Sequence, residues 1–125
     1  MNVVDSSTWL EYFAAGPLTG RFAAAIEATE ELIVPSVVLL EVTRRVMQQR
    51  GEDAALQAAA LLHQGQVVPL DSGLALSAAQ IGVNRKLPHA GSIIYATAEQ
   101  FEATIWTMDA DFKGLPRVRY YPKAK

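Results

Sequence analysis

Two aspartates directly follow short strand-like runs of the sequence. Asp5 ends a run that holds two valines, and Asp109 ends a second apolar run, with Asp111 two positions later. If the two runs are neighbouring parallel strands, these carboxylates meet at the sheet edge where α/β proteins place their ligands. Aspartate also commonly caps a following helix. Ser6 and Ser7 already offer capping oxygens, however, which leaves Asp5 available for chemistry.

A third acid, Glu41, interrupts an apolar stretch that is otherwise typical of a buried helix. At about 100° per residue it shares a narrow polar stripe with Arg44 and Arg45. One interpretation is an exposed Glu41–Arg45 ion pair four residues apart, which contributes only about 0.3–0.5 kcal/mol. The other is a carboxylate that points from the second helical turn into the crevice at the strand ends. The residues alone leave both interpretations open.

Carboxylates gathered in one pocket repel each other unless they take up protons or bind a cation. Two like charges about 4 Å apart cost about 4 kcal/mol at an effective dielectric of roughly 20. Oxygen ligands without cysteine suit Mg²⁺ or Mn²⁺ better than Zn²⁺. A hard divalent cation beside a phosphodiester activates water and offsets charge on the leaving oxygen. The acids therefore indicate a metal-dependent site for phosphate chemistry.

Short β-branched runs alternate with longer alanine- and leucine-rich segments along the chain. We expect strands at 3–4, 32–34, 67–70, 104–107 and 117–121, the last at a sheet edge. We expect helices at 6–15, 18–31, 37–50, 52–64, 72–85 and 92–102, with a single turn at 109–113. Ser36 and Asp71 read as helix N-caps, and Gly51 reads as a C-terminal stop. The alternation predicts an α/β/α sandwich around a mainly parallel sheet, in a single domain spanning 1–125.

Length and composition exclude several classes of protein. The chain has 125 residues, of which 50% are hydrophobic and 19% charged, so it forms one folded domain with apolar surface to spare for a partner. It has no cysteine, which excludes a disulfide scaffold and a thiolate metal site. The net charge of −2 gives no bulk attraction for nucleic acid. Without a membrane-spanning run or a signal peptide, we expect a cytoplasmic protein.

Four features of the sequence together resemble one protein family. They are Val3-Val4-Asp5-Ser6-Ser7, Glu41 after Pro35-Ser36, Leu87-Pro88-His89-Ala90-Gly91-Ser92-Ile93-Ile94-Tyr95-Ala96-Thr97-Ala98 and Thr107-Met108-Asp109-Ala110-Asp111-Phe112. In this order and spacing the chain resembles the PIN-domain family, and within it the VapC-like ribonuclease toxins of bacterial toxin–antitoxin pairs. The resemblance covers essentially the whole chain. It implies a PIN-like fold and an Mg²⁺- or Mn²⁺-dependent endoribonuclease.

The resemblance matches the acids of the family, residue by residue, to Asp5, Glu41 and Asp109, with Asp111 as a frequent extra acid. It implies that all four are catalytic and that the first three hold the metal. It also matches Ser7 and Thr107 to polar positions that support the acids through hydrogen bonds. Ser6 is a weaker candidate for such a role, because it is also well placed to cap the first helix.

The sequence departs from the family at the third acid, where Gly91 replaces an aspartate. Losing even a residue that supports a metal ligand typically costs roughly 10–100-fold in metal affinity or activity. We therefore expect an impaired nuclease. Natural drift and selected inactivation are two explanations that stay open. Compensation by His89 or Ser92 is a third, although a lone histidine beside a proline turn is more often a loop residue and a hydroxyl substitutes poorly for a charge.

The resemblance also implies partners, since toxins of this type commonly bind a cognate antitoxin and form homodimers. An RNA substrate needs cations near the acidic centre to hold its phosphates. Arg44, Arg45 and Lys86 are the candidates, because they adjoin the motifs. Basic residues that follow the last acid read as ordinary solubility charge: Lys113, Arg117, Arg119, Lys123 and Lys125.

Two other functions compete with the nuclease. A catalytically inactive homologue that dimerises and binds antitoxin accounts for Gly91 equally well, and this alternative stays open. A phosphoacceptor domain fits poorly, because Ser7 occupies the place where a haloacid-dehalogenase-like phosphatase needs an aspartate. No lysine lies suitably near Thr107 for a receiver domain. The chain also lacks a glycine-rich phosphate loop.

Overall fold

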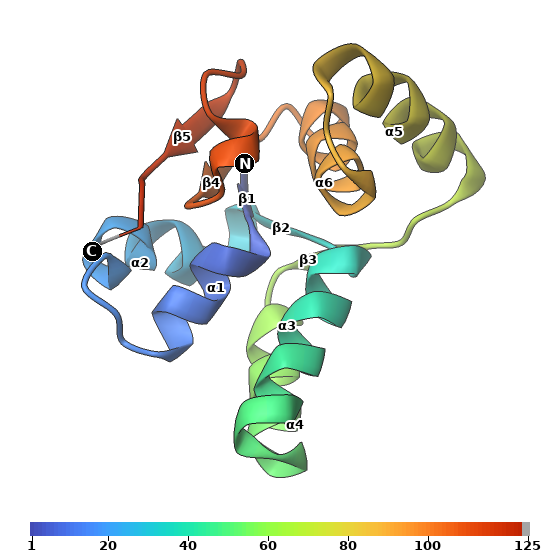
Figure 1. Cartoon of the computed structure of the whole chain (residues 1–125). Helices are drawn as coiled ribbons and strands as arrows, with labels where there is room; N and C mark the ends of the chain where they lie inside the picture. Colours follow the sequence, from blue (N-terminus) through green and yellow to red (C-terminus); the bar gives the residue numbers. More distant parts are fainter. Residues whose placement is uncertain (124–125) are drawn as a thin grey trace.

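Five short strands lie side by side in one parallel sheet (Figure 1). The computed structural model describes residues 1–123, so Lys125 falls outside the described residues. The strands are β1 (Asn2–Val4), β2 (Leu32–Pro35), β3 (Gln66–Val68), β4 (Thr104–Thr107) and β5 (Val118–Tyr120). Their spatial order is β3-β2-β1-β4-β5, and every neighbouring pair is parallel. The predicted α/β fold with a parallel sheet is confirmed, with β5 at the expected edge.

The central strands are buried on both faces, which explains their unbroken apolar sequence. Val3 and Val4 of β1 and Val34 of β2 have no exposed surface, and Ile33 has 1%. Strands covered by helices on both sides need apolar side chains in both directions, so they show no alternation of apolar and polar residues.

Helices cover both faces of the sheet, with α1 and α2 on one side and α6 on the other, where α5 packs against the outside of α6 (Figure 1). Their bounds are α1 (Ser6–Phe13), α2 (Thr19–Glu27), α3 (Ser36–Arg50), α4 (Glu52–Leu62), α5 (Ser72–Arg85) and α6 (His89–Gln100). Two short 3₁₀ helices are η1 (Thr29–Glu31) and η2 (Ala110–Phe112). Helices α3 and α4 form a hairpin that projects from the sheet.

The strand order creates a point where the direction of the chain across the sheet reverses. From the central strand β1 the chain moves outward through β2 and β3, then returns to place β4 and β5 on the other side of β1. The loops that leave β1 and β4 therefore diverge and open a crevice beyond the carboxyl ends of these two strands, which is where ligands bind in open parallel sheets.

Most predicted elements differ from the structure by one or two residues at an end, and the largest differences lie at two helix boundaries. The helix expected at 18–31 ends at Glu27, because Ala28 turns to ψ 69° and a separate 3₁₀ turn leads into β2. The helix expected to begin at Ser92 begins at His89. Asp71 caps α5 as predicted, since its Oδ1 accepts a hydrogen bond from the Leu74 N–H at 2.8 Å. Ser36 is not a cap, because it is already the first residue of α3.

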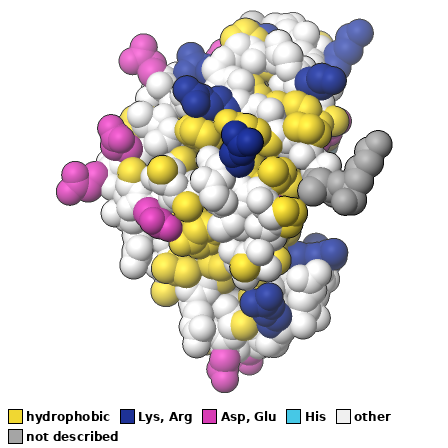
Figure 2. All heavy atoms as spheres, turned by 90° about the vertical axis from the view of Figure 1, so that its left-hand side faces the viewer, with side chains coloured by type: hydrophobic (Ala, Val, Ile, Leu, Met, Phe, Trp, Pro, Cys, Tyr) yellow, Lys and Arg dark blue, Asp and Glu magenta, His cyan; other side chains and the backbone are white. Residues whose placement is uncertain are grey.

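The surface combines segregated charge with scattered exposed hydrophobic residues. On the face shown in Figure 2, acidic side chains gather at the left edge and bottom, whereas most lysine and arginine side chains lie at the top and right. Leu76 and Val83 of α5 are 75% and 80% exposed. Within residues 1–123 no helix combines the length and the apolar character needed to cross a membrane.

Candidate active site at the carboxyl ends of the central strands

A small pocket of about 230 Å³ lies in the crevice between β1 and β4. We call it the acidic pocket, because its lining includes Asp5, Glu41 and Asp109 together with Gly91. The four residues come from four places in the chain: the end of β1, the second turn of α3, the end of β4 and the first turn of α6. A water molecule takes up roughly 30 Å³ of liquid volume, so the pocket has room for an ion and several waters.

Asp5 forms the buried base of the acidic pocket, with 5% of its surface exposed. Its Oδ2 accepts hydrogen bonds from the Ser7 hydroxyl at 2.8 Å and from the Thr107 hydroxyl at 2.9 Å. Its side chain makes no capping bond to α1, so the capping alternative does not apply. Burial raises the pKa of Asp5 above its ordinary value of 3.8, the two hydroxyls oppose that rise, and the negative charge of Asp109 adds to it.

Thr107 connects the two strand-end aspartates. Its buried hydroxyl donates to Asp5 and accepts a hydrogen bond from the Asp109 backbone N–H at 2.9 Å. Asp109 in turn accepts a hydrogen bond on Oδ1 from the Asp111 N–H at 2.9 Å, which caps η2. Asp109 is therefore both a cap and a lining residue of the acidic pocket, and the supporting position predicted for Thr107 has a definite geometry.

Glu41 reaches the acidic pocket from α3 and is held there by Ser6. The Ser6 hydroxyl donates to Glu41 Oε1 at 2.7 Å. Of the two interpretations of Glu41, the placement in the crevice is the one observed, and Arg45 lines a neighbouring hollow instead. Ser6, predicted only as a weaker supporting residue, is thus the one that fixes Glu41. The available signal was its position directly after Asp5 at the start of α1, where a hydroxyl faces the same crevice.

Gly91 is buried in the wall of the acidic pocket, yet the site does not require a glycine. A Cβ atom there would lie 3.5 Å from Phe112 Cζ and 3.6 Å from Pro88 Cδ, which are ordinary van der Waals distances. The position lies in the first turn of α6 and has helical backbone. The space for a side chain at position 91 is therefore present.

Neither residue considered as a substitute for the third acid lines the acidic pocket. His89 is exposed and faces the cavity between α5 and α6. The Ser92 hydroxyl donates to the Pro88 carbonyl at 2.8 Å and to the Leu87 carbonyl at 3.2 Å. Compensation by either residue has no support in the geometry.

Three further predicted site residues lie outside the acidic pocket. Asp111 is exposed on η2 and contributes its backbone N–H, not its carboxylate, to Asp109. Arg44 is exposed on α3, and Lys86 is the exposed left-handed C-cap of α5 with φ 58°. None of the three is among the residues that line the pocket.

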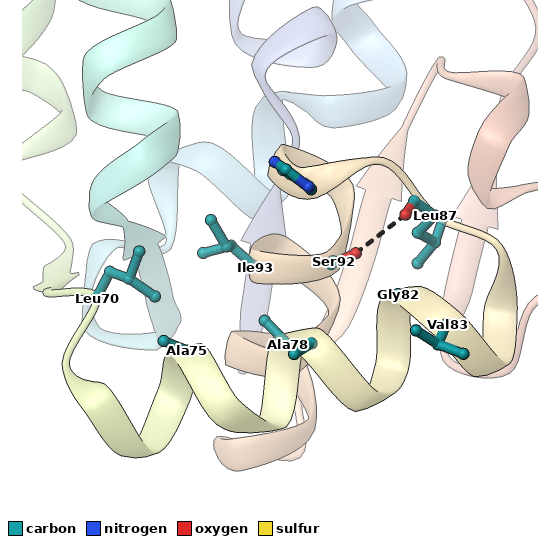
Figure 3. Close-up of a pocket in the computed structure, with 10 residues that line it drawn as sticks. Leu70, Ala75, Ala78, Gly82, Val83, Leu87, Ser92 and Ile93 are labelled. Atoms are coloured by element: carbon teal, nitrogen blue, oxygen red, sulfur yellow. Dashed lines mark hydrogen bonds between the residues drawn. The ribbon is translucent and has the colours of Figure 1, made fainter.

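A second cavity lies between α5 and α6 (Figure 3). Its walls are mostly aliphatic, with Leu70, Ala78, Val83 and Ile93 among the lining residues, and no acidic residue is among them. The dashed line in Figure 3 marks the bond from Ser92 to the Leu87 carbonyl. This cavity lacks the charged groups that phosphate chemistry needs.

The carboxylate oxygens of the acidic pocket are the type of ligand that a hard divalent cation prefers, but the pocket offers few of them. Within residues 1–123, no group of three acidic, histidine or cysteine side chains is arranged as a complete metal-binding cluster. Mg²⁺ is usually held by one or two carboxylates together with waters and substrate phosphates. Asp5 and Asp109 lie close enough for one charge to shift the pKa of the other, and they meet that minimum.

Solved structures of similar fold include a toxin–antitoxin complex and a toxin. A toxin–antitoxin complex from Klebsiella pneumoniae superposes with a TM-score of 0.82 at 20% identity, covering 98% of this chain and 100% of that one. VapC20 of Mycobacterium tuberculosis, a toxin that cleaves the sarcin–ricin loop, gives 0.74 at 22% identity, with coverages of 95% and 99%. FitAcB of Neisseria gonorrhoeae gives 0.75 at 20% identity, with coverages of 97% and 96%. At these identities the likeness shows the fold alone.

The sequence itself gives the family. Among curated proteins none matches this chain. The model of the PIN domain, however, matches residues 3–118, which hold both strand-end aspartates and every element of the sheet from β1 to the start of β5. The chain belongs to the PIN-domain family.

Proposed function

We propose that this protein is an Mg²⁺- or Mn²⁺-dependent endoribonuclease toxin of the cytoplasm, neutralised by a cognate antitoxin, and that Gly91 weakens it. The observation that carries the proposal is the acidic pocket, in which Asp5, Glu41 and Asp109 meet at the switch point of a parallel sheet. PIN-domain toxins are nucleases, and structures of similar fold include a toxin that cleaves the sarcin–ricin loop and complexes of toxin with antitoxin.

The residues of the pocket have different roles in this proposal. Asp5 and Asp109 would hold the cation, which when bound activates water and offsets charge on the leaving oxygen. Ser7 and Thr107 fix the orientation of the Asp5 carboxylate through two hydrogen bonds. Glu41, whose Oε1 accepts a hydrogen bond from the Ser6 hydroxyl, lines the same pocket and would be the third carboxylate to hold the cation, directly or through a bound water.

Gly91 reduces the number of carboxylates available to the cation. An aspartate at this position adds a ligand or an acceptor for a bound water, and its Cβ has room beside Phe112 and Pro88. A change of this kind in the surroundings of a metal typically alters affinity or activity roughly 10–100-fold. We therefore infer that the present chain binds its metal weakly.

An RNA cleavage assay in Mn²⁺ tests this proposal. We expect Gly91→Asp to cleave at least roughly 10-fold faster than the unmodified chain at subsaturating Mn²⁺. Gly91→Ala, which adds a methyl group without a ligand, serves as the matched control and should match the unmodified chain. Adding Asp5→Asn to Gly91→Asp should abolish cleavage. Equal cleavage by the aspartate and alanine variants would contradict the role given to position 91.

The second candidate is an inactive PIN protein that acts through binding, as a homodimer that captures antitoxin. Gly91 is the observation that favours it. This alternative predicts no metal-dependent cleavage by the unmodified chain at saturating Mn²⁺. It also predicts a stable complex with the antitoxin encoded beside it, measured by size-exclusion chromatography with light scattering. Cleavage that requires both Mn²⁺ and Asp5 would exclude this candidate.

A further inference from the structure

Two shallow hollows continue from the acidic pocket across the surface. The first is lined by Ser7, Met108, Asp109, Ala110, Tyr120 and Lys123. The second, between α1 and α3, shares Ser7, Met108 and Lys123 with the first and adds Arg45 and Gln49. Because Ser7 lines all three hollows and Asp109 lines the acidic pocket and the first hollow, the three hollows adjoin one another. We call the two outer hollows together the tail groove, after the C-terminal segment that forms one of its walls.

The charge of this surface changes sign along its length. The acidic pocket presents three carboxylates, whereas Lys123 lines both hollows of the tail groove and Arg45 lines the outer one; both cations are exposed. Glu11 also lines the outer end, but its Oε2 accepts a hydrogen bond from the Leu18 backbone N–H at 2.8 Å. That carboxylate is committed to the loop between α1 and α2, so the two cations dominate the outer end.

Cleavage of an RNA phosphate in the acidic pocket requires positive charge beside the negative charge of the pocket. The scissile phosphate must approach carboxylates that repel it, while neighbouring phosphates gain from direct contact with lysine and arginine. The half-buried Tyr120 lines the same hollow as Asp109 and Lys123, and its ring offers a surface for a base. Gln49 adds an amide beside Arg45.

We propose that Lys123 and Arg45 bind the phosphates next to the scissile one, so that the C-terminal segment is part of the binding site for single-stranded RNA. This inference rests on the proposed function for its substrate. It assigns a role to Lys123, which sequence analysis read as solubility charge, and it selects Arg45 from the three basic residues that adjoin the motifs. Lys123 and Arg45 are positioning residues, since they act on phosphates outside the acidic pocket.

A binding measurement without metal tests this inference separately from catalysis. The probe is a fluorescein-labelled single-stranded oligoribonucleotide of mixed sequence, titrated in EDTA over a series of salt concentrations and followed by anisotropy. We expect Lys123→Ala and Arg45→Ala each to weaken binding several-fold at low salt. Each should also lower the slope of log K against log salt by about 0.7. Lys123→Arg, which keeps the charge, should bind as the unmodified chain does.

Two matched controls separate local contacts from net charge. Arg50→Ala removes a cation from the same helix as Arg45, and Lys113→Ala removes one from the same C-terminal region as Lys123; neither residue lines the tail groove. Both controls should bind like the unmodified chain. Equal losses in all four alanine variants, no loss in any of them, or no RNA binding by the unmodified chain would each overturn the inference. If neither the unmodified chain nor Gly91→Asp cleaves RNA but the binding pattern is as predicted, the proposed nuclease is refuted and this RNA-binding surface stands.

Discussion

The hydroxyl of Thr107 makes hydrogen bonds to both aspartates that follow the central strands. It donates to the Asp5 carboxylate and accepts from the Asp109 amide, so one side chain sets the relative position of two acids from neighbouring strands. The register places Val4 opposite Trp106, so Asp5 and Thr107 are the next residues on their two strands. The supporting roles of Ser7 and Thr107 could be predicted from the resemblance, whereas the hydroxyl of Ser6 on Glu41 required the structure.

Thr107→Val tests this connection, because valine keeps the shape and removes the hydroxyl. We expect the free energy of unfolding to fall by about 2 kcal/mol, since a buried hydrogen bond to a charged group is worth roughly 1.5–3 kcal/mol. Chemical denaturation at neutral pH measures the change. Thr104→Val, at the other end of β4, is the matched control and should change stability far less.

Asp5→Asn tests the cost of keeping a carboxylate buried. Because burial raises the pKa of Asp5 in the folded protein, folding favours the protonated form. The stability contribution of this group is therefore fully present below the unfolded value of 3.8 and is lost as pH rises through the higher folded pKa. We expect Asp5→Asn to raise the free energy of unfolding at pH 7 in EDTA and to flatten its decline with pH.

Urea denaturation at several pH values between 4 and 8 provides the measurement for this variant. Asp111→Asn is the control, because Asp111 is exposed and its carboxylate does not line the acidic pocket. A variant at position 5 that is less stable than the unmodified protein at pH 7, with the same pH dependence, would show that the buried charge is not what limits stability.

At the scale of elements, local signals predicted the type of each segment better than its ends. The predicted start of α6 at Ser92 is three residues too late, because Pro88 is itself the N-cap and the helix begins at His89. Ser92 lies inside the first turns, where its hydroxyl donates to the carbonyls of Leu87 and Pro88. The end of α2 carries no glycine or proline, so the turn at Ala28 could not be predicted from residue preferences and follows from the entry into β2.

Two glycines in the packed pair α5 and α6 should respond to alanine in opposite ways. At Gly91 a Cβ has ordinary contacts, so Gly91→Ala should raise the free energy of unfolding by about 0.5–1 kcal/mol through the lower entropy of the unfolded chain. At Gly82 a Cβ would lie 2.5 Å from the bound hydroxyl of Ser92, so Gly82→Ala should lower it by about 1–3 kcal/mol. Thermal or chemical denaturation compares the two variants directly, and changes of the same sign would contradict the different surroundings described for positions 82 and 91.

At the scale of the whole molecule, the site depends on the order of the strands. The alternating pattern predicts parallel strands, but hydrophobicity alone does not specify that β4 lies beside β1 instead of beside β3. That order brings the residues that follow β1 and β4 to one crevice. Glu41 of α3 and Gly91 of α6 then line the same crevice. The resemblance predicted that the acids lie in one site, because the four motifs occur in the order expected for the family. The secondary-structure preferences of single segments could not predict this.

The strand order also explains why the sequence did not predict a role for Lys123 in the site. A lysine near the end of a chain has no local pattern that marks it as functional. The parallel pairing of β5 with β4 carries the chain back toward the carboxyl end of β4, and the next residues then pass beside Asp109 and Ser7. Such a placement follows from topology and could not be deduced from the composition of the tail.

Calorimetric titration with Mn²⁺ at neutral pH shows whether the acidic pocket holds a divalent ion, because it needs neither a substrate nor a partner. We expect weak binding by the unmodified chain and binding roughly 10–100-fold tighter by Gly91→Asp. We expect no binding by Asp5→Asn under the same conditions. Equal heats and affinities for the unmodified chain and Asp5→Asn would show that the buried carboxylate at the base of the acidic pocket does not hold the ion.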